Sequence, residues 1–152
     1  MNGKMPELTA YAGKLVLYSA QPLTGTEWEQ IGITFLNDIG SSCQEYGSLI
    51  GHIKGFLNLR EVGYFYLSTV SADQETSSRG EGKGKTSSSY LDFNILVYGI
   101  DKAELNVLVS RTATDLAQLF SLTYHIQHDH HVHSHPIKNR FKKLGKKWYI
   151  NK

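Results

Sequence analysis

Hydrophobic and polar positions alternate along the chain with two periods, one typical of helices and one of strands. In two segments, apolar residues recur every three or four positions, which places them on one side of an amphipathic helix. In several others, β-branched and aromatic residues alternate with polar ones, as in a strand with one buried face. The spacing predicts helices over 26–46 and 101–120, and strands over 14–19, 49–59, 62–70 and 90–100, with 124–133 as a further candidate.

Both predicted helices begin with a pattern typical of a capping box, in which side chains satisfy the free backbone amides of the first turn. Thr26 is followed three residues later by Glu29, and Asp101 is followed by Glu104. The apolar stripe of the first helix includes Cys43. We therefore interpret Cys43 as a small buried hydrophobe rather than a nucleophile.

The order of these elements indicates an α+β fold. We expect two amphipathic helices to pack on one face of a three- to five-stranded, mostly antiparallel sheet, as in ferredoxin-like sandwiches and their variants. The first predicted helix should cross between two parallel strands, those before and after it in the sequence.

Composition divides the chain into parts. Residues 1–124 are predicted to form a single α+β domain. Within it, 71–89 has no large apolar side chain to offset the entropy of ordering, so we expect a mobile loop there. Residues 125–135 form a histidine-rich segment, and 136–152 form a basic tail.

The composition as a whole is that of an ordinary globular protein, with 152 residues of which 40% are hydrophobic and 20% charged. No apolar run approaches the roughly 18 residues of a membrane span, and the first residues lead into no signal-peptide core. These features predict a cytoplasmic protein without membrane association. A single cysteine excludes an intramolecular disulfide and any multi-cysteine metal or iron–sulfur site.

The net charge of +2 conceals a basic C-terminal arm. From Pro136 onwards there are seven Lys or Arg residues and no Asp or Glu, with aromatic residues between them. Arms of this composition bind nucleic acid or an acidic protein surface in some proteins and are only solvated termini in others. Both interpretations remain open from the sequence.

Histidines are concentrated in one segment, where six of the seven fall within eleven residues. Imidazole nitrogens are ligands for zinc, nickel and cobalt, and the absence of neighbouring cysteines favours an exchangeable site over a structural one. The alternative is a polar segment without a physiological metal. The candidate metal ligands are His125, His128, His130, His131, His133 and His135.

Two familiar catalytic patterns are missing. Residues 80–87 resemble a phosphate-binding Walker A loop, but its first glycine would have to stand where the chain has Arg79. No nucleophile-elbow motif accompanies the histidines. We expect no enzymatic activity and no catalytic residues. The remaining enzymatic alternative uses a polar sheet face with His52, Lys54, Asp92 and Asn94.

The runs IGHIKG at 50–55, GYFYLSTV at 63–70 and LDFNILVYGI at 91–100 resemble a small α+β accessory domain of CobW-type metal-chaperone GTPases, over 49–110. The resemblance implies a role in delivering zinc, nickel or cobalt with a GTPase or metalloenzyme partner. It does not extend to GTPase activity, because an intact Walker A loop and a metal-thiolate motif are both missing.

Together these features predict a non-enzymatic accessory domain that binds a transition metal through its histidine-rich segment. The alternative is an interaction module that uses the basic arm to bind nucleic acid or an acidic protein surface, with the sheet as a scaffold.

Overall fold

The computed structural model describes residues 6–128, 141–144 and 147–150. The elements are β1 (Leu8–Thr24), α1 (Gly25–Tyr46), β2 (Leu49–Asn58), a 3-10 turn η1 (Arg60–Val62), β3 (Gly63–Thr69), β4 (Ser77–Gly82), β5 (Lys85–Tyr98), α2 (Lys102–Phe120), β6 (Leu122–His128), β7 (Phe141–Leu144) and β8 (Lys147–Ile150). Within these ranges, no helix is long and apolar enough to cross a membrane.

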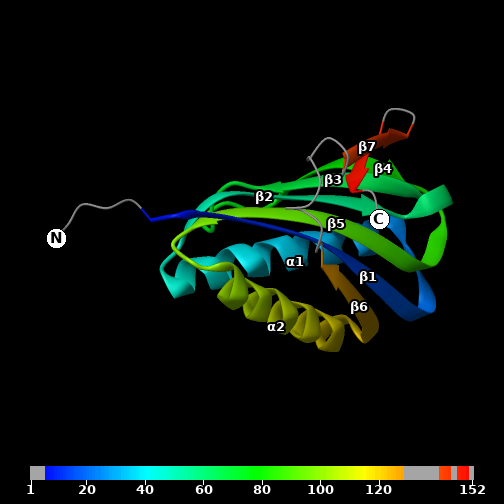
Figure 1. The fold of residues 1–152 in the computed structure, drawn as a ribbon. Coiled ribbons are helices and arrows are strands. Elements are labelled where there is room, and N and C mark those ends of the chain that lie inside the picture. The colour runs from blue at the N-terminus through cyan, green and yellow to red at the C-terminus, as the bar shows by residue number, and fades with distance from the viewer. Residues whose placement is uncertain (1–5, 129–140, 145–146, 151–152) are drawn as a thin grey trace.

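Six strands form one sheet in the order β4-β3-β2-β5-β1-β6, and every neighbouring pair is antiparallel. Because β1 and β2 both flank β5, they run parallel, and α1 crosses between them as predicted. In the same way, α2 connects β5 to β6 across β1 (Figure 1). The α+β class is confirmed, and the sheet is larger than the three to five strands expected.

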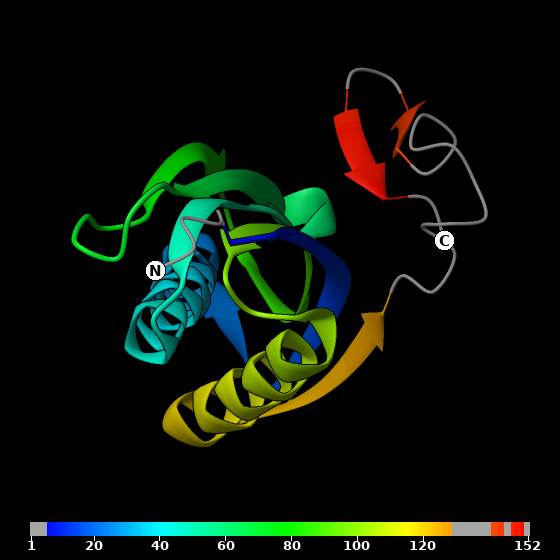
Figure 2. The ribbon, with the colours of Figure 1, turned by 60° about the vertical axis from the view of Figure 1, so that its left-hand side comes forward.

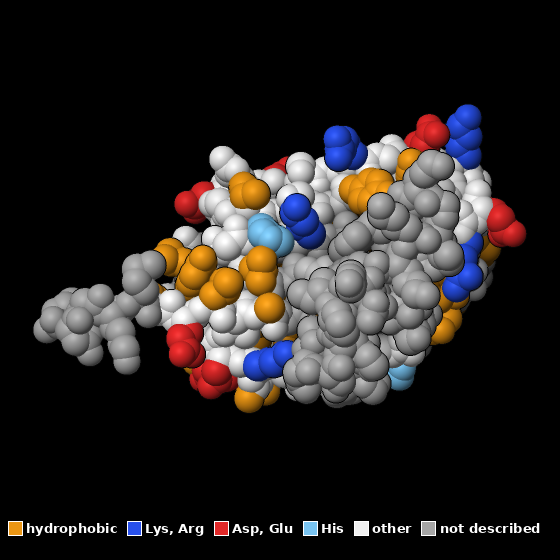
Figure 3. Space-filling model, turned by 45° about the horizontal axis from the view of Figure 1, so that its top comes forward, with side chains coloured by type: hydrophobic (Ala, Val, Ile, Leu, Met, Phe, Trp, Pro, Cys, Tyr) orange, Lys and Arg blue, Asp and Glu red, His pale blue; other side chains and the backbone are white. Residues whose placement is uncertain are grey.

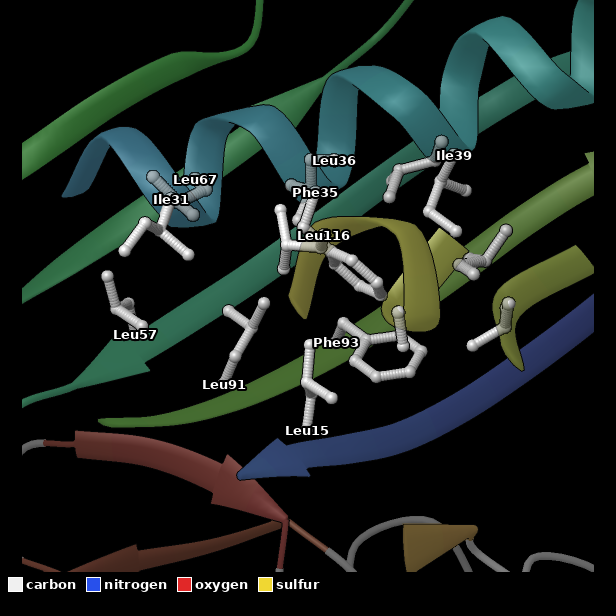
Figure 4. Packing of buried hydrophobic residues seen from close by; sticks show 14 of the residues in the cluster. Leu15, Ile31, Phe35, Leu36, Ile39, Leu57, Leu67, Leu91, Phe93 and Leu116 are labelled. Carbon is white, nitrogen blue, oxygen red and sulfur yellow. The ribbon is translucent and has the colours of Figure 1, made fainter. Parts of the chain in front are cut away.

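Both helices lie side by side against the same face of the sheet (Figure 2). Phe93 of β5 is fully buried between the layers, with its ring 5.4 Å from that of Phe35 on α1 and 6.1 Å from that of Tyr11 on β1. Figure 4 shows this contact among the leucine and isoleucine side chains of both layers. The predicted helical stripes are buried except near their ends, where Tyr46 and Leu119 are exposed.

The cap of the first helix is Thr24, two residues before the predicted cap Thr26. The Thr24 hydroxyl accepts a hydrogen bond from the Glu27 backbone N–H at 3.1 Å, and the Glu27 carboxylate accepts one from the Thr24 N–H at 2.8 Å. The predicted pair, Thr26 and Glu29, has the same spacing in sequence, so the capping rule alone does not distinguish the two. The start of α2 is confirmed, since Asp101 caps it.

The prediction of a loop over 71–89 was wrong for most of its length, because β4 and the first residues of β5 lie within it. Backbone ladder hydrogen bonds hold β4 against β3 without large side chains. The turn before β4 is fixed from α1, where the Asn37 side-chain oxygen accepts hydrogen bonds from the Thr76 N–H at 2.9 Å and the Thr76 hydroxyl at 2.6 Å.

Two further boundaries differ from the prediction. β1 is longer than the predicted strand over 14–19, because it pairs with β5 along most of its length. A last strand is confirmed in β6, and it continues through His128, so the first residues of the histidine-rich segment belong to the sheet. In the basic tail, β7 and β8 pair with each other as an antiparallel hairpin.

Candidate functional site

The histidine-rich segment starts within β6, an edge strand of the sheet. His125 pairs with Val16 of β1 and its side chain is exposed, whereas His128 pairs with Gly13. Positions three apart in a strand face opposite ways, so an intact β6 does not bring these two positions to one ion. The remaining candidates, His130, His131, His133 and His135, lie outside the described residues. Within the described part of the chain, no three metal-ligating side chains are grouped.

Cys43 lies on the buried side of α1, as the helical stripe predicted. Burial raises the pKa of its thiol to about 11, which keeps the sulfur protonated at neutral pH. A protonated, inaccessible thiol is a poor nucleophile. The Cys43 side chain therefore contributes to the packing of the hydrophobic core.

The sheet face away from both helices, which we name the open face, carries many of the polar side chains of the strands. Register sets its side chains in rows that cross the strands. Figure 3 shows this side of the molecule, with Lys, Arg and histidine side chains standing among hydrophobic ones. One row contains Lys14, Asp92, Phe56, Tyr66 and Arg79, and the next contains Asn94, Lys54, Ser68 and Ser77.

Three aromatic rings of β2 and β3 gather on the open face. The ring of Phe56 lies 5.0 Å from that of Tyr66 and 6.1 Å from that of Tyr64, and the two tyrosine rings are 5.5 Å apart. Phe56 is buried, whereas Tyr66 is 36% exposed. The cluster therefore places an exposed tyrosine beside a buried phenylalanine on the same face.

A second aromatic contact lies at the turn between β2 and β3. The Arg60 guanidinium stands 4.2 Å from the centre of the Tyr90 ring. Arg60 has a φ of 58°, in the left-handed region, and its backbone N–H donates to the Asn58 side-chain oxygen at 2.9 Å. A residue other than glycine in this region costs roughly 1–2 kcal/mol, so the surrounding turn must hold the conformation.

An ion pair crosses the middle of the open face. The Lys14 ammonium lies 3.4 Å from an Asp92 carboxylate oxygen, and the two side chains are only 11% and 4% exposed. Their strands are direct neighbours, with the two residues opposite each other in register. Removing one charge of such a buried pair is strongly destabilising.

A hollow of about 730 Å³ opens over β2, β3 and β4. Its described lining includes two cations, Lys54 and Arg79, the ring of Tyr66, and the hydroxyl-bearing Ser68 and Ser77. Lys54, Arg79 and Ser77 are exposed. The described lining contains no carboxylate, so the hollow suits an anionic ligand of moderate size.

The polar cluster expected from the sequence is partly assembled. Lys54 of β2 stands directly opposite Asn94 of β5, and Asp92 lies two residues from Asn94 on the same face. His52 lies two residues before Lys54, opposite Leu96. Asp92 pairs with Lys14, and it lies four residues along β5 from Leu96, the partner of His52, so the register keeps Asp92 and His52 apart and gives no acid–base relay between them.

Acidification is expected to reduce stability through His52. Burial, and then the charge of Lys54, lower the pKa of His52 in the folded state below its usual value. Because folding favours the neutral ring, this contribution is fully present above about pH 6.5 and is lost as the pH falls through the lowered folded-state value. Urea unfolding from about pH 7.5 to 5 should show a shallower acid loss in His52→Gln than in the wild type or in the exposed control His125→Gln. Identical pH profiles of stability for all three proteins would contradict this prediction.

Sequence patterns did not indicate the hollow. Alternation in β2 and β3 showed that Lys54 and Tyr66 could share a face, but Arg79 lay in the segment expected to be a loop. The signal that would have found it is the alternation of the charged Arg79 and Glu81 with the small Ser78 and Gly80, read as an edge strand.

No family model matches this chain, and no curated protein does. Among solved structures, a hydantoinase/carbamoylase family amidase from Burkholderia ambifaria is similar over 82% of this chain and 28% of its own, with a TM-score of 0.42 and 9% sequence identity. This chain therefore spans little more than a quarter of the amidase's length. A likeness at this level carries no conclusion about activity, and the function has to be argued from the site itself.

Proposed function

We propose that this chain is a non-enzymatic binding module that takes a transition-metal ion, zinc, nickel or cobalt, through its histidine-rich segment. The observation that carries the proposal is the concentration of six of seven histidines within eleven residues. Imidazole-only ligand sets suit these borderline metals, and their exchange is faster than that of thiolate sites built into a core. The buried, protonated Cys43 supports a site without sulfur.

The position of β6 divides the candidate ligands. His125 is held by the ladder on the open face, so its side chain is fixed relative to β1. The four histidines from His130 to His135 follow β6 in the sequence and lie outside the described residues. We therefore assign the ion to His128 and the residues after it. Delivery to a GTPase or metalloenzyme partner, which the resemblance implies, is the corresponding cellular role.

Calorimetric titration of the tag-free, chelator-treated full chain with Zn²⁺ and Ni²⁺ tests the proposal. We expect micromolar or tighter affinity at neutral pH, and at least about tenfold weaker binding when His130, His131, His133 and His135 are all replaced by alanine. Affinity should also fall as the pH drops below about 6.5, because a protonated imidazole cannot coordinate. A quadruple variant with unchanged affinity would exclude the segment as the site.

The matched control is His125→Ala, which removes a histidine of the same segment while leaving the four later ones. We expect its affinity to stay within about twofold of the wild type. Point substitutions are preferable to truncation before residue 125, because that truncation would remove most of β6 from its pairing with β1. A large loss in His125→Ala would place the ligand set on the strand instead.

The second candidate is binding of a polyanion by the basic arm, and the observation favouring it is the run of seven cations without a carboxylate from Pro136 onwards. Its signature is a steep loss of affinity with added salt and insensitivity to chelators. The two candidates are therefore separable in one set of titrations.

A further inference from the structure

We propose that the hollow over β2, β3 and β4 binds single-stranded nucleic acid, with a base stacked on Tyr66 and phosphate oxygens bound by Lys54 and Arg79. This site uses the open face and none of the candidate metal ligands.

The antiparallel register brings the groups of the hollow together. Tyr66 of β3 stands directly opposite Arg79 of β4, and in the next row Lys54 of β2 stands opposite Ser68. Neighbouring strands are about 4.8 Å apart, so the three strands place the two cations on either side of the tyrosine at roughly 10 Å across the sheet. This span accommodates one nucleotide between two phosphate contacts.

The charges of the hollow favour an anion. Lys54 and Arg79 are exposed and are the charged side chains of its described lining. Two carboxylates stand near the hollow on the open face: Asp92, which pairs with Lys14, and the exposed Glu81, two residues from Arg79 on β4 and outside the lining. Ser77 adds a hydroxyl at the rim, which donates a hydrogen bond to the Ser68 carbonyl at 3.3 Å and can also accept one. Arginine and lysine contacts of this kind hold phosphate groups and carry no sequence preference.

The aromatic cluster supplies the surface for a base. Tyr66 is 36% exposed, and the ring of buried Phe56 lies beside it on the neighbouring strand, with ring centres 5.0 Å apart. Bases of single strands stack on such rings, whereas the bases of a duplex are already stacked on each other and cannot be reached. This is the reason for proposing a single strand rather than a duplex.

A second platform extends the surface along the same strands. Arg60 stands over Tyr90 at the turn after β2, two residues beyond Asn58, which pairs with Tyr90. The backbone of Arg60 is held there in a left-handed conformation. Strained residues that are maintained by local hydrogen bonds are concentrated at binding sites. Arg60 therefore provides the next cation for a strand that leaves the hollow in this direction.

Fluorescence anisotropy with a labelled oligothymidine of about 12 nucleotides, in the presence of a chelator, tests the site on the full chain. We expect Tyr66→Ala to weaken binding about 5- to 150-fold, and Tyr66→Phe, which keeps the ring, to remain within about threefold of the wild type. An abasic oligomer of equal length should bind equally to the wild type and to Tyr66→Ala, since it offers phosphates but no base.

Variants of the cations separate the hollow from the arm. Lys54→Gln and Arg79→Gln should each weaken binding of both oligomers and reduce the salt slope by about one. Arg111→Gln, on the outer side of α2, is the matched control and should change affinity less than twofold. Circular dichroism confirms that each variant is folded.

Three results would overturn the proposal. One is no measurable binding by the folded wild type at low salt. Another is equal affinity of Tyr66→Ala and wild type for oligothymidine. The third is a loss of affinity in Lys142→Gln/Lys143→Gln with none in Lys54→Gln or Arg79→Gln, which would assign the binding to the basic arm. Because chelator is present throughout, none of these results depends on the metal proposal.

Discussion

Asp92→Ala is expected to lower the free energy of unfolding by about 3–5 kcal/mol, because it removes one charge of a buried ion pair and leaves the other in a site with little access to water. Asp92 is almost fully buried on the open face, and its carboxylate lies 3.4 Å from the Lys14 nitrogen. Removing the carboxylate leaves Lys14 desolvated, with its side chain only 11% exposed. Urea unfolding of the purified variant measures the loss.

The double variant Lys14→Met/Asp92→Leu distinguishes this mechanism from simple loss of packing. Replacing both residues by apolar side chains of similar size removes both buried charges, so the stability of the double variant should return to within about 1 kcal/mol of the wild type or exceed it. Glu81→Ala, an exposed carboxylate on β4, should cost less than about 0.5 kcal/mol. A small effect in Asp92→Ala would mean that the Lys14 ammonium reaches water when its partner is removed.

The elements that were predicted correctly are those in which a regular apolar pattern extends over many residues. The stripe of Trp28, Ile31, Phe35 and Ile39 is buried along α1, and Leu91, Phe93, Ile95 and Val97 line the core side of β5. Each pattern spans several turns or several residue pairs, so one unusual residue does not obscure it. The number of strands was underestimated because the missing strand has no such pattern.

β4 illustrates why a pattern of side chains is insufficient. Its residues are small or charged, and their stability depends on hydrogen bonds to β3 and on the contact of Thr76 with Asn37, which lies 39 residues away in sequence. An edge strand of this composition is protected against pairing with other chains, and in sequence it resembles a loop. The error over 71–89 therefore came from a long-range contact.

The candidate sites differ in the same way. The histidines are conspicuous in sequence because they are contiguous, and no fold is needed to count them. The hollow is assembled from three strands, with Lys54 and Arg79 separated by 25 positions, so only the register reveals that they share a ligand-sized space. Alternation indicated the face of each strand correctly, but it could not indicate which strands are neighbours.

The turn that organises the open face depends on Gly63, and Gly63→Ala is expected to lower the free energy of unfolding by at least about 2–3 kcal/mol. Gly63 has a φ of 146°, and an added Cβ would overlap the backbone carbonyl of Glu81 on the neighbouring strand. Its N–H also donates to the Arg60 carbonyl at the end of η1. Relief of the overlap requires β3 and β4 to separate, which thermal or urea unfolding measures.

Gly47→Ala is the matched control, because Gly47 also has a positive φ, of 97°, but an added Cβ there meets no atom within 4 Å. Its cost should be confined to backbone strain of about 1 kcal/mol. The difference between the two variants isolates the steric overlap at the β3–β4 junction, and equal losses would show that strain alone accounts for both. Because Arg79 lies on β4 opposite Tyr66, separation of these strands would also widen the hollow, so Gly63→Ala should weaken oligothymidine binding while Gly47→Ala leaves it unchanged.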